Sequence, residues 1–473
     1  MRPLTNVLVV GSGAREHAIV SKLLGQGSRV RDVYVAPGNA GTGMIARNLP
    51  IDVEDVGSLQ RAVLQYKIDL TIVGPEAALA AGVVDVFQAS RFRIFGPSQA
   101  AARVESSKAF ARDLMAKAGV PHPEGRSFTD LHEARDYVYR TGTPIVIKAD
   151  GLAAGKGVVI AFSPAEADAA LEDALLRRTF GDAGATVVIE EYLEGPEVSL
   201  LAFTDGKTVV PMVPAADYKR VFDGGLGPNT GGMGAYSPPP FFGPEQMAWS
   251  KDHILQPMVD ALAAEGCPFV GVLYAGLMVT RDGIKVLEFN ARFGDPETQV
   301  ILPRLKTDLV EIANACIDGR LDTLKVEWSD DACVGVVLTS EGYPGPYPTG
   351  RAITGLDRLE DGVRVYHGGT QVPPAQGNTG LGRFFNANLP TVPLDELLSG
   401  NVQTAGGRVL TVVAGGATVT DARARVYRNV AYVNFEGAHY RKDIGLPPLE
   451  PADPGTKPAR AQLPPRSPGV GNG

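Results

Sequence analysis

The sequence predicts a protein of several domains, with a parallel α/β domain at its N-terminal end and an α+β domain at its C-terminal end. The chain has 473 residues, enough for roughly two to four domains. Over roughly the first hundred residues, short apolar runs alternate with helical stretches, a pattern typical of right-handed βαβ units and a parallel sheet. From Ser329 onward the pattern changes to α+β. There we expect strands at 333–338, 363–367 and 409–414 and a helix that begins at 421–426.

The N-terminal strands all end in turns that are rich in glycine, proline or asparagine. We expect these strands at 7–10, 33–36, 70–73 and 93–95, and helices that include 16–24 and 59–65. The turns that follow contain Gly13, Asn39 and Glu76. Parallel sheets bind ligands beyond the carboxyl ends of their strands, so a ligand site is expected at this edge.

The first of these turns, Gly11-Ser12-Gly13-Ala14-Arg15-Glu16, resembles a dinucleotide-binding fingerprint. The sixth position is Glu16 instead of glycine or alanine, so the close helix–strand packing of that fingerprint should be lacking. No acidic residue closes the second strand, which argues further against a nicotinamide cofactor. A phosphate at the helix N-terminus and a tight turn without a ligand both remain open.

The middle of the chain contains a glycine-rich segment between two expected strands, 144–149 and 158–161. It follows a helix expected from Ser106 to Ala118 and precedes a helix at 165–175 and a strand at 187–191. Residues 148–157 read Lys-Ala-Asp-Gly-Leu-Ala-Ala-Gly-Lys-Gly, one residue short of a Walker loop and without its final Ser or Thr. We therefore expect a hairpin lid that closes over phosphates, with Lys148 and Lys156 nearby. The alternative is a surface hairpin without a ligand.

A possible metal site lies at 285–298, which read Lys-Val-Leu-Glu-Phe-Asn-Ala-Arg-Phe-Gly-Asp-Pro-Glu-Thr. On a strand, Glu288 and Asn290 lie on one face, because alternate side chains point the same way. One anionic and one neutral oxygen ligand suit Mg²⁺ held jointly with nucleotide phosphates. Arg292 follows with the same parity and suits a carboxylate or phosphate. Taken alone, the segment could equally be a strand end with solvated polar residues.

Two further segments suggest binding. Residues 190–197, Glu-Glu-Tyr-Leu-Glu-Gly-Pro-Glu, could give a base an apolar floor and a ribose a carboxylate, although alone they would be read as an acidic turn. The segment 217–237 contains six glycines within eleven residues, which we expect to exclude a regular element. Its position between Lys219-Arg220 and Tyr236 favours a loop that faces a substrate.

Composition narrows the classes of function. A net charge of −8 argues against a nucleic-acid-binding protein but allows small anionic substrates. The 3 cysteines are widely spaced, which fits neither a disulfide framework nor a zinc site and favours a reducing, cytoplasmic setting. No apolar run has transmembrane length and no signal peptide is visible. Residues 451–473 are rich in Pro and Gly, and we expect a disordered tail.

Taken in order, these motifs resemble those of ATP-grasp ligases, and in detail those of the phosphoribosylamine–glycine ligase (glycinamide ribonucleotide synthetase) family of purine biosynthesis. The resemblance covers about residues 1–446 and rests on the motifs at 13–18, 36–41, 72–76, 148–157, 227–237, 290–297 and 441–445. Two features depart from the family pattern. Ala291 stands where a cysteine is frequent, and residues 376–402 are longer than usual.

The resemblance implies a domain plan. Residues 1–103 would form the N-terminal domain that binds phosphoribosylamine, and 104–328 a central ATP-grasp fold with a lid at about 124–192. Residues 329–447 would form the C-terminal α+β domain, and 448–473 the tail.

The resemblance also implies roles for single residues. Lys108 and Lys148 would contact the phosphates of ATP. The covering loop would include Gly151, Gly155, Lys156 and Gly157. Glu190 and the backbone of Leu193 would meet the adenine, and Glu197 the ribose. Glu288 and Asn290 would bind Mg²⁺ or Mn²⁺. Asp217 and Arg292 would hold the ammonium and carboxylate of glycine and, with Lys148, form the catalytic set. Gly13, Arg15, Asn39 and Glu76 would lie on the phosphoribosyl side.

The implied reaction is the ATP-dependent joining of glycine to 5-phospho-β-D-ribosylamine by a cytoplasmic monomer that binds neither nucleic acid nor membrane. Nearby alternatives are an ATP-grasp carboxylase that acts on aminoimidazole ribonucleotide and, more distantly, a D-alanine–D-alanine ligase. A non-catalytic nucleotide-binding regulator and an NAD-dependent oxidoreductase represent other classes. Lys148, Glu288 and Asn290 argue against the regulator, and Glu16 argues against the oxidoreductase.

Overall fold

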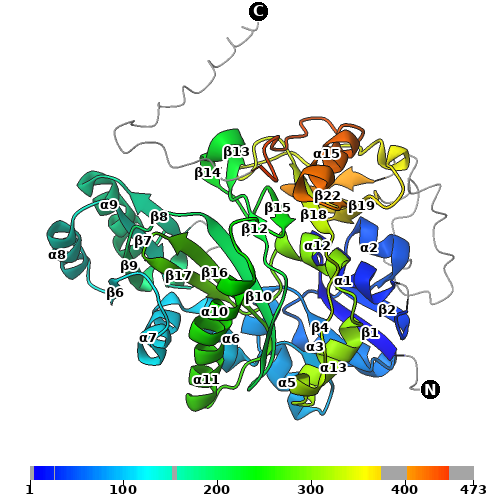
Figure 1. Cartoon of the computed structure of the whole chain (residues 1–473), viewed down its shortest axis with the longest axis horizontal. Helices are drawn as coiled ribbons and strands as arrows, with labels where there is room; N and C mark the ends of the chain where they lie inside the picture. Colours follow the sequence, from blue (N-terminus) through cyan, green and yellow to red (C-terminus); the bar gives the residue numbers. More distant parts are fainter. Residues whose placement is uncertain (1–4, 26, 152–156, 374–401, 447–473) are drawn as a thin grey trace, which may run out of the picture.

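The computed structural model describes residues 5–25, 27–151, 157–373 and 402–446. A central sheet lies between the N-terminal sheet and a smaller unit that stands apart at one end of the molecule (Figure 1). Some positions discussed above fall outside the described residues. These are Gly155, Lys156, the long segment at 376–401 and the expected tail at 448–473.

The N-terminal part is a five-stranded parallel sheet of order β3-β2-β1-β4-β5, as its sequence pattern predicts. Its strands are β1 (Thr5–Gly11), β2 (Val30–Pro37), β3 (Arg47–Asn48), β4 (Leu70–Val73) and β5 (Ile94–Phe95). Its helices are α1 (Ala14–Leu23), α2 (Ala40–Ile45), α3 (Val56–Gln65), α4 (Glu76–Ala80) and α5 (Val83–Ala89). The residues Val7 to Val10 of β1 are fully buried, because helices cover both faces of the sheet.

Two helices link this sheet to the rest of the chain: α6 (Gln99–Ser106) and α7 (Lys108–Ala118). The single helix expected from Ser106 to Ala118 is therefore wrong at its start. Ser107 is extended at φ −139° and ψ 108°, and its hydroxyl accepts a hydrogen bond from the Phe110 N–H at 3.1 Å. Ser107 thus caps α7, and Lys108 becomes its first helical residue.

The smaller unit is a four-stranded sheet of order β6-β9-β7-β8 with helices on it. Its elements are β6 (Gly125–Phe128), α8 (Leu131–Thr141), β7 (Ile145–Ala149), β8 (Val158–Ala161), α9 (Pro164–Leu171), a π-helical turn (Glu172–Leu176) and β9 (Val187–Glu191). The antiparallel pairing of β7 with β8 confirms the hairpin expected around the glycine-rich segment. The apolar core of this unit contains only residues from Phe128 to Ile189, so it packs as a separate body.

The central sheet has the order β11-β10-β16-β17 and is antiparallel. Its strands are β10 (Glu197–Asp205), β11 (Val209–Pro211), β16 (Val270–Thr280) and β17 (Gly283–Asn290). The helices of this region are α10 (Pro244–Ser250), α11 (Gln256–Ala264), α12 (Glu297–Ile301) and α13 (Leu309–Ile317). One continuous core contains Val10 of β1 and Leu273 of β16, which joins this sheet to the N-terminal part.

The C-terminal sheet has the order β12-β15-β18-β22-β19 and is covered by α15 (Val419–Val430). Its strands are β12 (Ala216–Asp217), β15 (Gly234–Ser237), β18 (Ala332–Thr339), β19 (Arg364–His367) and β22 (Arg408–Gly416). A short pair of strands, β20 (Thr370–Gln371) and β21 (Gln403–Thr404), lies beside it. Because β12 and β15 precede residue 329, this sheet extends across the expected domain boundary.

The glycine-rich stretch after Asp217 is more regular than its composition suggests. It forms a small antiparallel hairpin of β13 (Arg220–Phe222) and β14 (Leu226–Asn229). Gly224 and Gly225 make the turn at φ +69° and +71°, values that favour glycine. The expectation that no regular element would form here is therefore wrong, because β13 and β14 pair across the turn although Gly227 lies within β14.

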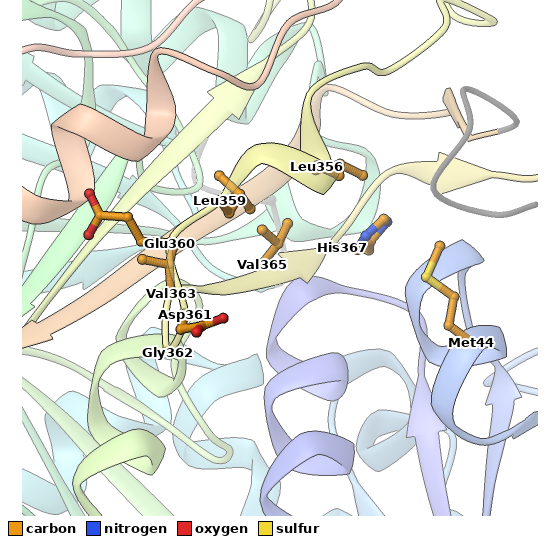
Figure 2. A pocket seen from close by; sticks show the side chains of 9 residues that line it. All are labelled: Met44, Leu356, Leu359, Glu360, Asp361, Gly362, Val363, Val365 and His367. Atoms are coloured by element: carbon orange, nitrogen blue, oxygen red, sulfur yellow. The ribbon is translucent and has the colours of Figure 1, made fainter. Parts of the chain in front are cut away.

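The N-terminal and C-terminal parts also meet directly. The backbone N–H of His367 donates to His17 Nδ1 at 2.9 Å, and Asn39 Nδ2 donates to the carbonyl of His367 at 2.7 Å. Beside this contact lies a cavity of about 330 Å³ between Met44 of α2 and the C-terminal residues Val365 and His367 (Figure 2). Its lining includes none of the residues expected to bind substrate, although His367, which lines it, accepts a hydrogen bond from one of them, Asn39.

Candidate active site

The end of β17 presents Glu288 and Asn290 on one face, with Phe289 buried on the other. Opposite Glu288 lies Gly276, where a Cβ would come within 3.3 Å of Glu288 Cγ, so this glycine leaves room for the carboxylate side chain. In the part of the chain that the structure describes, neither polar side chain has a protein hydrogen-bond partner, and no group of three or more His, Cys, Asp or Glu residues could hold a metal. Two free oxygen donors therefore suit a cation that takes its other ligands from phosphates and water.

Three lysines surround the Glu288 carboxylate. Burial acts to raise the pKa of Glu288, but the ammonium groups of Lys219, Lys148 and Lys108 outweigh burial and leave the pKa below its ordinary value. The carboxylate is therefore ionised at neutral pH, as metal binding requires.

The two lysines expected to contact phosphates are held by backbone carbonyls. Lys148 donates to the carbonyl of Leu287 at 2.8 Å, one residue before Glu288, and Lys108 donates to the carbonyl of Gly151 at 2.9 Å. Burial lowers the pKa of Lys108, although Glu288 opposes this shift. Each ammonium has three donors, so each lysine can hold its carbonyl and still donate to phosphate oxygens.

Gly151 begins the glycine-rich segment in a conformation that favours glycine. Its φ is +112°, and a Cβ there would come within 2.8 Å of Ala183 Cβ. At the far end, the carbonyl of Gly157 accepts from the Ala149 N–H at 2.8 Å, which closes the hairpin. Both glycines thus lie at the base of the expected lid.

The chain passes from the smaller unit to the central sheet through Glu190 of β9, Leu193 and Glu197 of β10. Glu190 is 4 % exposed, and its carboxylate lies 2.7 Å from Lys148 Nζ and 3.3 Å from Arg112 Nη1. Leu193 lies in the irregular stretch between β9 and β10, where its backbone can meet a ligand. Glu197, at the start of β10, accepts a hydrogen bond from Lys219.

Asp217 lies at the end of β12. Its side chain is 7 % exposed, and its Oδ1 is 3.6 Å from Lys219 Nζ. Lys219 therefore joins Asp217 to Glu197. Nearby, the carboxylate of Glu297 accepts hydrogen bonds from Ser199 Oγ at 3.0 Å and from Tyr274 Oη at 2.7 Å.

Arg292 connects the end of β17 to the N-terminal part. Its Nε donates to Glu76 Oε2 at 2.9 Å, its Nη1 donates to the carbonyl of Phe293 at 3.1 Å, and its Nη2 lies 2.9 Å from Glu105 Oε1. Burial acts to lower the pKa of Arg292, but Glu105 and Glu76 raise it above its ordinary value. Burial also acts to raise the pKa of Glu76, yet Arg292 holds it at about 2.

The residues expected on the phosphoribosyl side are mostly bonded within the chain. The N–H of Gly13 donates to Glu16 Oε2 at 2.6 Å, and Arg15 pairs with the same carboxylate and donates to the carbonyl of Phe293 at 3.2 Å. Asn39 Oδ1 accepts from the Thr42 N–H at 3.0 Å. A phosphate at the start of α1 would therefore meet the Glu16 carboxylate, which already accepts the Gly13 N–H.

The C-terminal part contributes a residue that no sequence motif predicts. Arg408 of β22 donates to the carbonyl of Gly231 at 2.5 Å, to the carbonyl of Asp295 at 3.0 Å and to Asp295 Oδ2 at 2.9 Å. The hydroxyl of Tyr343 accepts from the Gly231 N–H at 3.0 Å. The C-terminal part thus holds the stretch after β14 against the turn that follows β17.

Sequence reasoning missed five residues at this site: Glu105, Arg112, Ser199, Tyr274 and Arg408. None is part of a glycine-rich turn or an alternating strand pattern that carries a recognisable ligand chemistry. Their partners lie far away in the sequence, so only the folded chain reveals them.

One negative finding concerns membranes. Within the described ranges, no helix combines the length and the apolar character needed to cross a bilayer.

Comparison with known proteins covers nearly the whole chain. Family models of the phosphoribosylglycinamide synthetase N domain, ATP-grasp (A) domain and C domain match residues 5–105, 106–298 and 333–447. The phosphoribosylamine–glycine ligase of Halalkalibacterium halodurans is 50 % identical over 440 residues, which are 93 % of this chain and 96 % of that protein. The ligase of the same name from Caldanaerobacter subterraneus is 46 % identical over 438 residues, with 93 % and 99 % covered.

Solved structures agree. The crystal structure of phosphoribosylamine–glycine ligase from Thermotoga maritima superposes with a TM-score of 0.76 at 30 % identity, covering 93 % of this chain and 99 % of that one. The biotin carboxylase domain of 2-oxoglutarate carboxylase from Hydrogenobacter thermophilus, solved with MgADP and bicarbonate, has a TM-score of 0.67 at 15 % identity, covering 93 % and 92 %. At that identity the second match shows a shared fold alone.

Proposed function

The chain belongs to the phosphoribosylglycinamide synthetase family, and on this premise we propose that it joins glycine to 5-phospho-β-D-ribosylamine while ATP is split to ADP and phosphate. The product is glycinamide ribonucleotide, an intermediate of de novo purine biosynthesis. The single observation that carries this proposal is the convergence at the end of β17, where a free carboxylate–amide pair lies beside Lys148, Lys108 and Arg292.

Glycine needs activation because its carboxylate oxygen is a poor leaving group. We propose that a carboxylate oxygen of glycine attacks the γ-phosphorus of ATP, so that the bond from this phosphorus to the bridging oxygen breaks and ADP leaves. The amine nitrogen of phosphoribosylamine then attacks the carbonyl carbon of glycyl phosphate. The C–O bond to phosphate breaks, phosphate leaves and the nitrogen loses a proton as the amide forms.

The protein acts mainly by position and charge, as is usual for phosphoryl transfer. In this proposal Lys108 and Lys148 donate to phosphate oxygens. The adenine lies against Glu190 and the backbone of Leu193, and Glu197 accepts the ribose hydroxyls. Gly151 and Gly157, at the two ends of the glycine-rich segment, are proposed to lie near the phosphates; residues 152–156 are outside the described residues.

Glycine is proposed to lie between two charged groups of opposite sign. The carboxylate of Asp217 faces the ammonium of glycine, and the guanidinium of Arg292 faces its carboxylate. Charged pairs of this kind, buried and hydrogen-bonded, orient a small substrate that offers no side chain to grip. The phosphoribosyl group is proposed to lie at the N-terminal strand ends near Gly13, Arg15, Asn39 and Glu76.

Glu288 and Asn290 are proposed to hold a divalent cation, Mg²⁺ or Mn²⁺. Hard oxygen donors that have no hydrogen-bond partner among the described residues fit such an ion, and the two of them leave most of its coordination positions for phosphates and water. When bound, the cation would neutralise phosphate charge and orient the γ-phosphoryl group.

Several finer points belong to the same proposal. We propose the domain limits 1–103, 104–328 and 329–447, with the lid at about 124–192. We also propose a monomer in the cytoplasm that acts on small molecules and binds neither nucleic acid nor membrane. The reducing setting agrees with three free, buried cysteines: Cys267, Cys316 and Cys333.

The test is a coupled assay of phosphate release, with phosphoribosylamine generated in place. Full rate should require ATP, a divalent cation, glycine and phosphoribosylamine together. If another amino acid replaced glycine without loss, or aminoimidazole ribonucleotide and bicarbonate replaced both substrates, the proposed substrates would be wrong.

A substitution of Glu288 tests the proposed cation site. Glu288→Ala should lower kcat by about 100-fold or more, because it removes the charged ligand of the proposed cation. Glu265→Ala is the matched control, since Glu265 forms an ion pair with Lys117 at the surface. An unchanged melting temperature would show that the fold is intact, and near-normal turnover of Glu288→Ala would reject this cation site.

A further inference from the structure

Glu105 lies directly behind the residue proposed to bind the carboxylate of glycine. It is the penultimate residue of α6, and its side chain is 8 % exposed. No motif described above includes it. Its two carboxylate oxygens face two different groups of the strand end that follows Asn290.

The first oxygen, Oε1, lies 2.9 Å from Arg292 Nη2. The second, Oε2, accepts a hydrogen bond from the backbone N–H of Ala291 at 2.8 Å. Ala291 lies between Asn290, proposed to bind the cation, and Arg292. A single carboxylate therefore fixes both the backbone and the guanidinium at the point where β17 ends.

The donors of Arg292 show what this arrangement leaves free. A guanidinium has one N–H on Nε and two on each terminal nitrogen. Nε donates to Glu76, one Nη1 donor goes to the carbonyl of Phe293, and Nη2 faces Glu105. Among the described residues, at least one N–H on Nη1 and one on Nη2 are left without a hydrogen-bond partner. The terminal nitrogens of a guanidinium can receive a carboxylate in two hydrogen bonds.

Because Glu105 is buried, its carboxylate needs its two partners to remain in place. A buried carboxylate without a partner is strongly unfavourable, so the ionised group holds its partners in place. Burial raises the pKa of Glu105, whereas the guanidinium of Arg292 opposes that shift. On the opposite side, Glu76 reaches Nε from the N-terminal part. The guanidinium therefore lies between the carboxylate of Glu76 in α4 and the carboxylate of Glu105 in α6.

We propose that Glu105 is a positioning residue that orients Arg292, so that the two remaining donors of the guanidinium receive the carboxylate of glycine. This inference rests on the proposed function, because it takes Arg292 as the group that binds glycine. Glu105 itself touches neither substrate. It acts on glycine through Arg292, and on the end of β17 through the N–H of Ala291.

The test is Glu105→Gln, which keeps the shape of the side chain. The amide oxygen can still accept from the Ala291 N–H, but the amide NH₂ then faces the Arg292 guanidinium, donor against donor. The KM for glycine should rise by about tenfold or more, as expected when one charge of a buried ion pair is removed. The KM for ATP should stay within about twofold, because the nucleotide groups do not contact Glu105 in this arrangement.

Two further variants complete the experiment. Glu265→Gln makes the same chemical change in a surface ion pair and should leave both KM values unchanged. Glu105→Asp keeps the charge but is one methylene shorter, so it should raise the KM for glycine less than Glu105→Gln does. If Glu105→Gln does not fold, Glu105→Asp decides the matter by the same comparison of the two KM values.

Each outcome is decisive. A selective rise in the KM for glycine supports the positioning role. An unchanged KM for glycine, or an equal rise in both KM values with a lowered melting temperature, overturns it. If the wild-type protein shows no glycine-dependent phosphate release, the proposed function fails instead, so the two failures are distinguishable.

Discussion

Asp217 allows a direct test of the electrostatics of the site through the pH dependence of stability. Burial raises the pKa of Asp217 from 3.8 to about 7, and the carboxylate of Glu297 adds to this shift, whereas the ammonium of Lys219 opposes it. The side chain is 7 % exposed, so solvent screens these interactions little. Replacing Asp217 by Asn keeps the shape and removes the titration.

The sign follows from proton linkage. The pKa of Asp217 is higher in the folded state than in the unfolded state, so the folded state binds the proton more tightly. Its contribution to stability is therefore complete below pH 3.8 and is lost as the pH rises to about 7. At about 1.4 kcal/mol per pH unit, the loss between pH 5 and pH 7 is on the order of 3 kcal/mol.

The assay compares melting temperatures of the wild-type protein and Asp217→Asn at pH 5, 6, 7 and 8, with EDTA to keep divalent cations away. A chain of this length unfolds with an entropy of about 1 kcal/mol/K, so 3 kcal/mol corresponds to about 3 °C. The melting temperature of Asp217→Asn minus that of the wild type should increase by about 3 °C between pH 5 and pH 7, and by little more above pH 7.

Two results would refute this reasoning. A difference that does not vary with pH would show that Asp217 titrates alike in both states. If the melting temperature of the wild type instead rises relative to that of Asp217→Asn as the pH increases, the ion pair with Lys219 outweighs the effect of burial on the pKa of Asp217.

Two other perturbations address how the parts of the chain hold the site together. Arg408→Met should lower kcat/KM for phosphoribosylamine by about tenfold or more in the coupled assay, because Gly231 and Asp295 lose their shared charged donor. An unchanged value would show that the C-terminal part does not hold the site. Glu16→Ala should lower the melting temperature by about 2 °C in a thermal scan, because the Gly13 N–H and the Arg15 guanidinium lose their buried acceptor. A change below about half a degree would mean that water replaces the carboxylate without loss of stability.

The sequence predicts those parts of the site that depend on neighbours in the chain. Strand alternation is enough to place Glu288 and Asn290 on one face, and the structure has them there. Glycines between two strands are enough to predict the β7–β8 hairpin. In both cases the period of the backbone decides the direction of the side chain, and no distant residue is needed.

Sequence patterns predict the structure poorly where a side chain can bond either to its neighbours in the chain or to distant residues. Ser107 could continue a helix, but its hydroxyl caps the next one instead, and the predicted helix is broken there. Arg408 is an ordinary strand residue by its neighbours, yet its partners are 177 and 113 positions away. Glu105 likewise finds Arg292 only because α6 packs against β17.

Glu16 shows how a departure from a motif can be informative. The fingerprint that it interrupts uses a small residue at this position, and we expected Glu16 to prevent close packing of helix and strand. The structure instead accommodates the side chain over Gly11 and Gly74, where a Cβ would come within 2.5 Å and 2.0 Å of it. Its carboxylate accepts the N–H of Gly13, a donor at the N-terminus of α1 that a dinucleotide pyrophosphate would otherwise use. The same residue therefore disfavours a dinucleotide at this strand end and fixes the turn that contains Gly13.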